Sequence, residues 1–201
     1  MARVILAALW LIFFLLSIPV GLTALGAGTG LLALPYELYV VKLRIPWVFA
    51  CHSLASGLAL LLMPAVFAAT GHTLHKYLGR ITAALVLAGG LAALPVAFFS
   101  VASPMARAGF FAQGLVWLAF DGLAYLAIRQ GNAGRHRALM FGMAAVASGA
   151  SWLRLTTVAV AALRLPFVPV YATAAWACWL IPLMAVPLIA KRTGVATGPS
   201  L

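Results

Sequence analysis

The chain has 201 residues, of which 66% are hydrophobic and only 7% are charged, and its mean hydropathy is +1.13. Soluble domains have an apolar share nearer half, so this composition excludes a globule covered by water. The formal net charge of +11 comes mostly from basic residues at the ends of apolar segments, where they set membrane orientation. The composition therefore predicts an all-α integral membrane protein, with the lipid bilayer and not nucleic acid as its partner.

Apolar runs of about 20 residues match the roughly 30 Å hydrocarbon thickness of a bilayer. Six such runs, separated by breaks rich in Gly, Pro and charge, predict membrane-spanning helices at 4–27, 47–69, 81–102, 108–128, 138–162 and 168–190. We expect a six-helix transmembrane bundle whose second to fifth helices form a four-helix core. The corresponding segments are 1–46 (first helix and outer loop), 47–162 (four-helix core) and 163–201 (last helix and cytoplasmic tail). No internal repeat of 20–50 residues is evident.

The first apolar segment follows Arg3 and ends in the small residues TALGA, which is also typical of a secretory signal peptide. Its apolar run is long for that purpose, so we expect an uncleaved first helix. The outer loop that follows, 28–46, contains LPYELYVVKLRIPW. It is long enough for a short helix on the membrane surface, with Glu37, Lys42 and Arg44 facing water.

The Lys and Arg residues are unequally divided between the two sides of the predicted membrane. With the N-terminus inside, the inner set is Arg3, Lys76, Arg80, Arg129, Arg135, Arg137, Lys191 and Arg192, and the outer set is Lys42, Arg44, Arg107 and Arg164. Because cytoplasmic loops carry an excess of Lys and Arg, this division predicts that both termini are cytoplasmic.

Strongly polar side chains inside the predicted spans are costly and need partners. They are His52 in the second span, Gln113 and Asp121 on one face of the fourth, and Arg154 in the fifth. His52 and Arg154 share the outer half, where they could hold an anionic head group, a haem propionate or a quinone oxygen. Alternatively, Arg154 bonds helix-end carbonyls and extends outward. Asp121 either bonds a Gln, Ser or Thr of a neighbouring helix or serves as a proton-coupled site.

Two further histidines lie at the inner membrane surface. His75 precedes the predicted third span within GHTLHKYLGR, and His136 precedes the fifth within GRHRALM. Adjacent helices that each offer an imidazole at the same depth can ligate one haem iron axially. The alternative is that both are solvated beside Lys and Arg, because no CxxCH motif is present. His72, in the same stretch as His75, is expected to face water.

The sequence gives little support to hydrolytic chemistry. Glu37 and Asp121 are the only two carboxylate side chains, and they lie in different membrane layers, so a paired acid–base site is not available. No GxSxG or HExxH motif is present. Cys51 and Cys178 both lie in apolar segments, without metal-binding spacing. No catalytic residue is therefore predicted.

Four stretches in the order FACHSLASGLALLLMPAVF, LHKYLGRITAALVLAGGLA, VWLAFDGLAYLAIRQGNAGRHRALM and SWLRLTT resemble the bacterial membrane family catalogued as domain of unknown function 2306. The resemblance covers about residues 48–160. It implies a location in the bacterial inner membrane. The family's characteristic polar positions match His52, His75, Gly79, Arg80, Arg129, His136 and Arg154.

Three hypotheses for function remain open. The family's four-helix core, with histidines at helix ends, is similar to transmembrane b-type cytochromes, an analogy of fold that favours a redox protein. In that reading His75 and His136 bind haem b, and His52 with Arg154 binds a propionate or a quinone. The alternatives are an accessory subunit packed against partner subunits of a larger membrane complex and a proton-coupled transporter that uses Asp121.

Overall fold

The computed structural model of the protein describes the backbone of residues 2–193 and the side chains of residues 11–188. In that part the chain forms seven helices and no strand. They are α1 (Ala2–Thr29), α2 (Tyr36–Arg44), α3 (Pro46–Ala68), α4 (Thr73–Phe99), α5 (Pro104–Arg129), α6 (Ala133–Ala162) and α7 (Phe167–Thr193). All except α2 are long and apolar enough to cross a membrane, which confirms the predicted all-helical membrane bundle. The predicted cytoplasmic tail and the side chains of Arg3, Lys191 and Arg192 lie outside the described residues.

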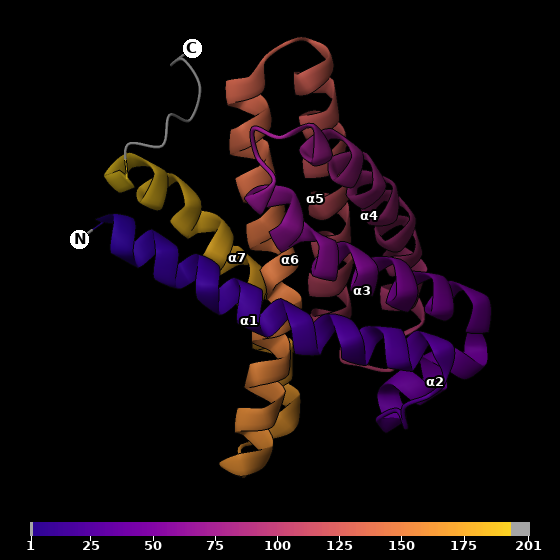
Figure 1. The fold of residues 1–201 in the computed structure, drawn as a ribbon. Helices are drawn as coiled ribbons and strands as arrows, with labels where there is room; N and C mark the ends of the chain where they lie inside the picture. Colours follow the sequence, from indigo (N-terminus) through magenta and orange to yellow (C-terminus); the bar gives the residue numbers. More distant parts are fainter. Residues whose placement is uncertain (1, 194–201) are drawn as a thin grey trace.

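Consecutive helices from α3 to α6 pack against each other as an up-and-down bundle. In Figure 1 the α3–α4 and α5–α6 turns lie at the upper end of this bundle, and α2 lies near the lower end. We call these the inner and the outer end, following the predicted orientation. α1 packs against α3, and α7 packs against α5 and α6. The centre is filled by Met63, Val86, Trp117, Met143 and Ala147, among other apolar side chains.

The two helices that follow the inner turns begin earlier than the sequence predicts. α4 starts at Thr73 instead of 81, and α6 starts at Ala133 instead of 138. Gly71 (φ +89°) and Gly131 (φ +75°) adopt left-handed conformations that confine each turn to a few residues. The basic stretches predicted as loops are therefore the first helical turns, where long cationic side chains extend out of the hydrocarbon.

Glycines allow close helix contacts at two crossings. Gly21 of α1 and Gly57 of α3 face each other, and a Cβ atom on either would lie 3.0 Å from the other's carbonyl oxygen. At the α5–α7 contact, a Cβ on Gly109 would lie 2.8 Å from the carbonyl oxygen of Ala175. Small residues at these positions let the backbones approach, as is typical of helix packing in membranes.

The outer end contains α2, which confirms the predicted short helix in the 28–46 loop. Arg44 donates from Nη1 to the carbonyl oxygen of Phe99 at 3.1 Å, and Arg107 donates from Nη2 to that of Phe98. Both guanidinium groups thus satisfy carbonyls at the C-terminus of α4, where a cation is favoured. Of Glu37, Lys42 and Arg44, which were expected to face water, the structure fully exposes only Arg44. Arg44 is exposed but bonded, while the other two are half-buried, because α2 packs against α3 and α4.

Candidate functional site

The inner end presents two histidines with the same local geometry. His75 Nδ1 lies 2.9 Å from the carbonyl oxygen of Val66, and His136 Nδ1 lies 2.9 Å from that of Ala124. A carbonyl oxygen can only accept a hydrogen bond, so each Nδ1 carries the hydrogen. In the neutral imidazole this leaves the lone pair on Nε2, the nitrogen that is free to bind a metal or accept a proton.

The two histidines occupy equivalent places in two helical hairpins. Each lies in the first turn of the second helix and bonds a carbonyl near the end of the first, α3 for His75 and α5 for His136. Each is followed by a cation and by buried residues at the same spacing. On α4 the face is His75, Thr82 and Val86, and on α6 it is His136, Met143 and Ala147. The two units are offset by about 60 residues, longer than the 20–50-residue periods that indicate repeat architectures.

His75 and His136 are half-buried, whereas His72 is exposed, as expected. His75 lies two residues and His136 three residues inside their helices, so each imidazole is within about 5 Å of its helix start. We expected the helices of His75 and His136 to be adjacent. This is wrong, because α4 and α6 both pack against α5 but not closely against each other.

At this end α3 reaches α6 through Phe67 and Phe141, whose stacked rings are 5.7 Å apart. The aromatic pair joins the two hairpins at the level of the two histidines. Each hairpin therefore fixes its own imidazole, and the bundle holds both at one end.

His52 lies in the outer half and shows a third instance of the same bond. Its Nδ1 lies 2.9 Å from the carbonyl oxygen of Gly89 and 3.3 Å from Ser56 Oγ. Since the Nδ1 hydrogen is donated to the carbonyl, Ser56 Oγ can only share it as a second acceptor. A Cβ on Gly89 would lie 2.5 Å from Ser56 Oγ and 3.0 Å from the Ser56 backbone nitrogen. Glycine at 89 therefore allows the helix contact that positions His52.

Arg154 is half-buried, and among the described residues its one hydrogen bond is a long one of 3.4 Å, donated from Nη1 to the carbonyl oxygen of Ala150 in its own helix. It interacts electrostatically with both His52 and Tyr171, and Glu37 interacts with Tyr171. The structure thus brings the predicted residues His52 and Arg154 into one outer group. The structure adds Tyr171 of α7 and Glu37 of α2 to this group. The sequence did not predict them, because no motif or spacing relates these two residues to His52 and Arg154.

Gln113 and Asp121 do not join either group of residues. Gln113 donates from Nε2 to the carbonyl oxygen of Val146 at 3.0 Å, and it packs on Gly149, so it ties α5 to α6. Asp121 is half-buried, and among the described residues it forms no hydrogen bond or ion pair. The expected bond from Asp121 to a neighbouring Gln, Ser or Thr is therefore absent from that part of the chain.

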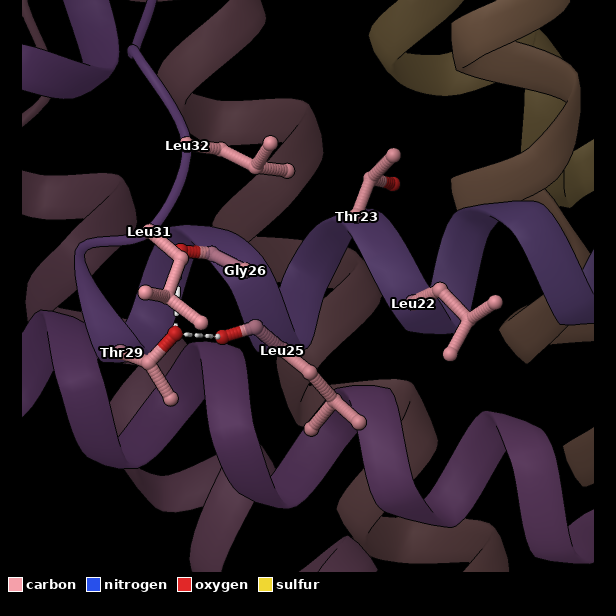
Figure 2. Close-up of a pocket in the computed structure, with 7 residues that line it drawn as sticks. All are labelled: Leu22, Thr23, Leu25, Gly26, Thr29, Leu31 and Leu32. Carbon is pink, nitrogen blue, oxygen red and sulfur yellow. Dashed lines mark hydrogen bonds between the residues drawn. The ribbon is translucent and has the colours of Figure 1, made fainter.

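An open apolar hollow of about 450 Å³ lies at the outer end of α1 (Figure 2). It is lined by Leu22, Thr23, Leu25, Gly26, Thr29, Leu31 and Leu32. Thr23 and Thr29 donate to carbonyls of their own helix, so their hydroxyl hydrogens are already used. The hollow contains no titratable side chain and is not part of the candidate site.

Among the described residues, no group of three or more His, Cys, Asp or Glu side chains could hold a metal ion. Haem iron has a different requirement, because the porphyrin supplies four ligands and the protein supplies only axial ones. The chemistry of two imidazoles with free Nε2 atoms fits that requirement.

The helices and their hydropathy define a multi-pass α-helical membrane protein. A family model described as "Predicted membrane protein (DUF2306)" matches residues 47–190, which is more than half of the chain. The chain therefore belongs to this family, as its motifs indicated, and the match extends beyond residue 160 into α7. No curated protein and no solved structure matches the chain.

Proposed function

We propose that the protein is a membrane redox protein that binds a b-type haem through His75 and His136. The observation that carries this proposal is the pair of 2.9 Å bonds from Nδ1 to the carbonyl oxygens of Val66 and Ala124. Histidines that ligate metals almost always donate their other ring N–H to a carbonyl, a carboxylate or water, which fixes the tautomer and orients the ring.

The alternative, that these imidazoles are simply solvated, explains the geometry less well. A solvated histidine has no need of a backbone carbonyl, and His72, only three residues before His75, is exposed and makes no side-chain hydrogen bond to the described residues. His75 and His136 instead sit half-buried in equivalent positions. The repetition in two hairpins favours a shared role over two independent coincidences.

The charge of the inner end also suits this cofactor. Lys76 and Arg137 directly follow the two histidines and are exposed, so they are available to the propionates that a haem carries. A haem at this position would supply one-electron transfer. The chain's own contribution is to hold both imidazoles by their Nδ1 hydrogens, keep both Nε2 lone pairs free, and place cations beside them.

Arg154 does not belong to this proposed site. It lies on the same face of α6 as His136, but eighteen residues further along the helix, or about 27 Å. The central apolar side chains, including Trp117 and Met143, lie between the two ends of the bundle. Of the three ligands expected for His52 and Arg154, a propionate of this haem is therefore disfavoured, and the outer group requires a ligand of its own.

The test is an absorption spectrum of the protein purified from cells that were supplied with a haem precursor. We expect a Soret band and, on reduction, sharp α and β bands. His75→Ala and His136→Ala should each remove or shift these bands, because each removes one axial ligand. His72→Ala is the matched control, since it removes an exposed histidine from the same turn, and it should leave the spectrum unchanged.

Two results would contradict the proposal. The first is a colourless wild-type protein that remains folded after haem supplementation and after addition of haemin in vitro. The second is a bound haem whose spectrum is the same in wild type, His75→Ala and His136→Ala, which would place the cofactor elsewhere.

A further inference from the structure

The outer group contains a cation without a counter-charge. No carboxylate of the described residues lies within 4 Å of the Arg154 guanidinium, whose one bond goes to its own helix at 3.4 Å. An arginine inside a membrane span is costly, and such residues pair with one another, with carbonyls or with ligands. Its remaining donors are therefore available to a partner that the chain does not itself provide.

The neighbours of Arg154 are neutral hydrogen-bonding groups. The His52 Nδ1 hydrogen is held by Gly89, so its Nε2 lone pair can accept a hydrogen bond but cannot donate one to an anion, whereas the Tyr171 phenol can donate. One turn before Arg154, the Ser151 hydroxyl is buried, with the residue 2% exposed, and it forms no hydrogen bond to any described residue. Such an unpartnered buried polar atom costs free energy unless a water or a ligand meets it.

This part of α6 also borders the lipid. Trp152, Leu155 and Val158, which flank Arg154, are 39%, 43% and 66% exposed. A molecule with an acyl chain can therefore lie against α6 and present its head group to Arg154 without entering the packed centre of the bundle.

We propose that Arg154, together with Tyr171, binds the oxyanion head group, a carboxylate or a phosphate, of an amphiphile from the outer leaflet. An oxyanion compensates the guanidinium charge and can accept two parallel N–H bonds from it. A neutral quinone, another ligand expected from the sequence, would leave the guanidinium charge uncompensated, which costs free energy in the hydrocarbon. The proposal does not depend on haem binding at the inner end.

The experiment uses the full chain in micelles of dodecyl maltoside, a detergent that carries neither a charge nor a phosphate. Native mass spectrometry measures binding of oleate, of oleoyl lysophosphatidate, of oleyl alcohol and of an isoprenoid quinone. We expect oleate, the lysophosphatidate or both to bind at a single site, and the two neutral compounds to bind at least about tenfold more weakly, since a charged hydrogen bond is lost. Binding of oleate alone identifies a fatty acid, and binding of the lysophosphatidate alone identifies a phospholipid.

Arg154→Gln should weaken binding of the anion by about ten- to a hundredfold, and Tyr171→Phe by about fivefold. Arg135→Gln is the matched control, because it removes one exposed cation at the opposite end of α6, and it should bind like wild type. If Arg154→Gln does not fold, the binding measured with Tyr171→Phe tests the proposal instead. The proposal is overturned if the alcohol or the quinone binds as tightly as the anions, if neither anion binds, or if Arg135→Gln weakens binding as much as the Arg154 or Tyr171 variant.

Discussion

Gly89→Ala tests the contact that positions His52. The added Cβ would lie 2.5 Å from Ser56 Oγ, which rotation of the side chain can relieve. It would also lie 3.0 Å from the Ser56 backbone nitrogen and 3.3 Å from its Cα. These two atoms move only if α3 and α4 separate, which stretches the 2.9 Å bond from His52 to the carbonyl of residue 89. Overpacking of this kind costs about 1–3 kcal/mol.

Gly79→Ala is the control in the same helix. A Cβ on Gly79 has no neighbouring atom within 4 Å, so alanine there only improves helix propensity, by about 0.5–1 kcal/mol. The two variants should therefore differ in free energy of unfolding by about 1.5–4 kcal/mol. Reversible unfolding in mixed micelles with increasing sodium dodecyl sulfate, followed by circular dichroism, measures this difference. Equal stability of the two variants would refute the claim that the α3–α4 contact requires glycine at 89.

Three further predictions concern helix ends and orientation. Arg164 has φ +54° just beyond the C-terminus of α6, so Arg164→Gly should raise the free energy of unfolding by up to about 1 kcal/mol in the same assay. The Ser103 side chain accepts a hydrogen bond from the Ala106 backbone nitrogen at the start of α5, so Ser103→Ala should lower the free energy of unfolding by about 1 kcal/mol. Equal stability of this variant and wild type would show that the cap contributes nothing. In a chain without Cys51 and Cys178, Lys76→Cys and Arg137→Cys should not be labelled when a membrane-impermeant maleimide is added to intact cells. Labelling at either position would contradict the predicted orientation.

The spans were predictable because bilayer thickness imposes one length on every apolar helix. The break points were not, because charge within GHTLHKYLGR is equally consistent with a loop and with the first turn of a helix. Thr73 begins α4 and Gly71 carries the positive φ, so the turn is shorter than the run of polar residues. Long cationic side chains let the helix extend past the hydrocarbon. The run of polar residues therefore does not predict the residue at which the backbone turns.

The candidate site was predictable in its residue types but not in its contacts. His52 and Arg154 stand out because polar groups are rare in the spans, and His75 and His136 stand out because each precedes a predicted span at the inner surface. Their hydrogen bonds go to backbone carbonyls, which every residue has, so no sequence signal identifies the acceptor. Arg44 shows the same limit, since counting it as an outer charge gives no hint that it caps α4.

The separation of the two ends leads to a last prediction, that the inner and outer sites act independently. His136 and Arg154 lie on one face of α6 about 27 Å apart, with Met143 and Ala147 packed in the core between them. Substitutions more than about 10 Å apart with no shared partner usually have additive effects. His136→Ala should therefore leave binding of the anion within about twofold of wild type, and Arg154→Gln should leave the haem spectrum and its loading unchanged. A spectral change in Arg154→Gln, with the protein folded, would show that the packed centre transmits a structural change from one end to the other.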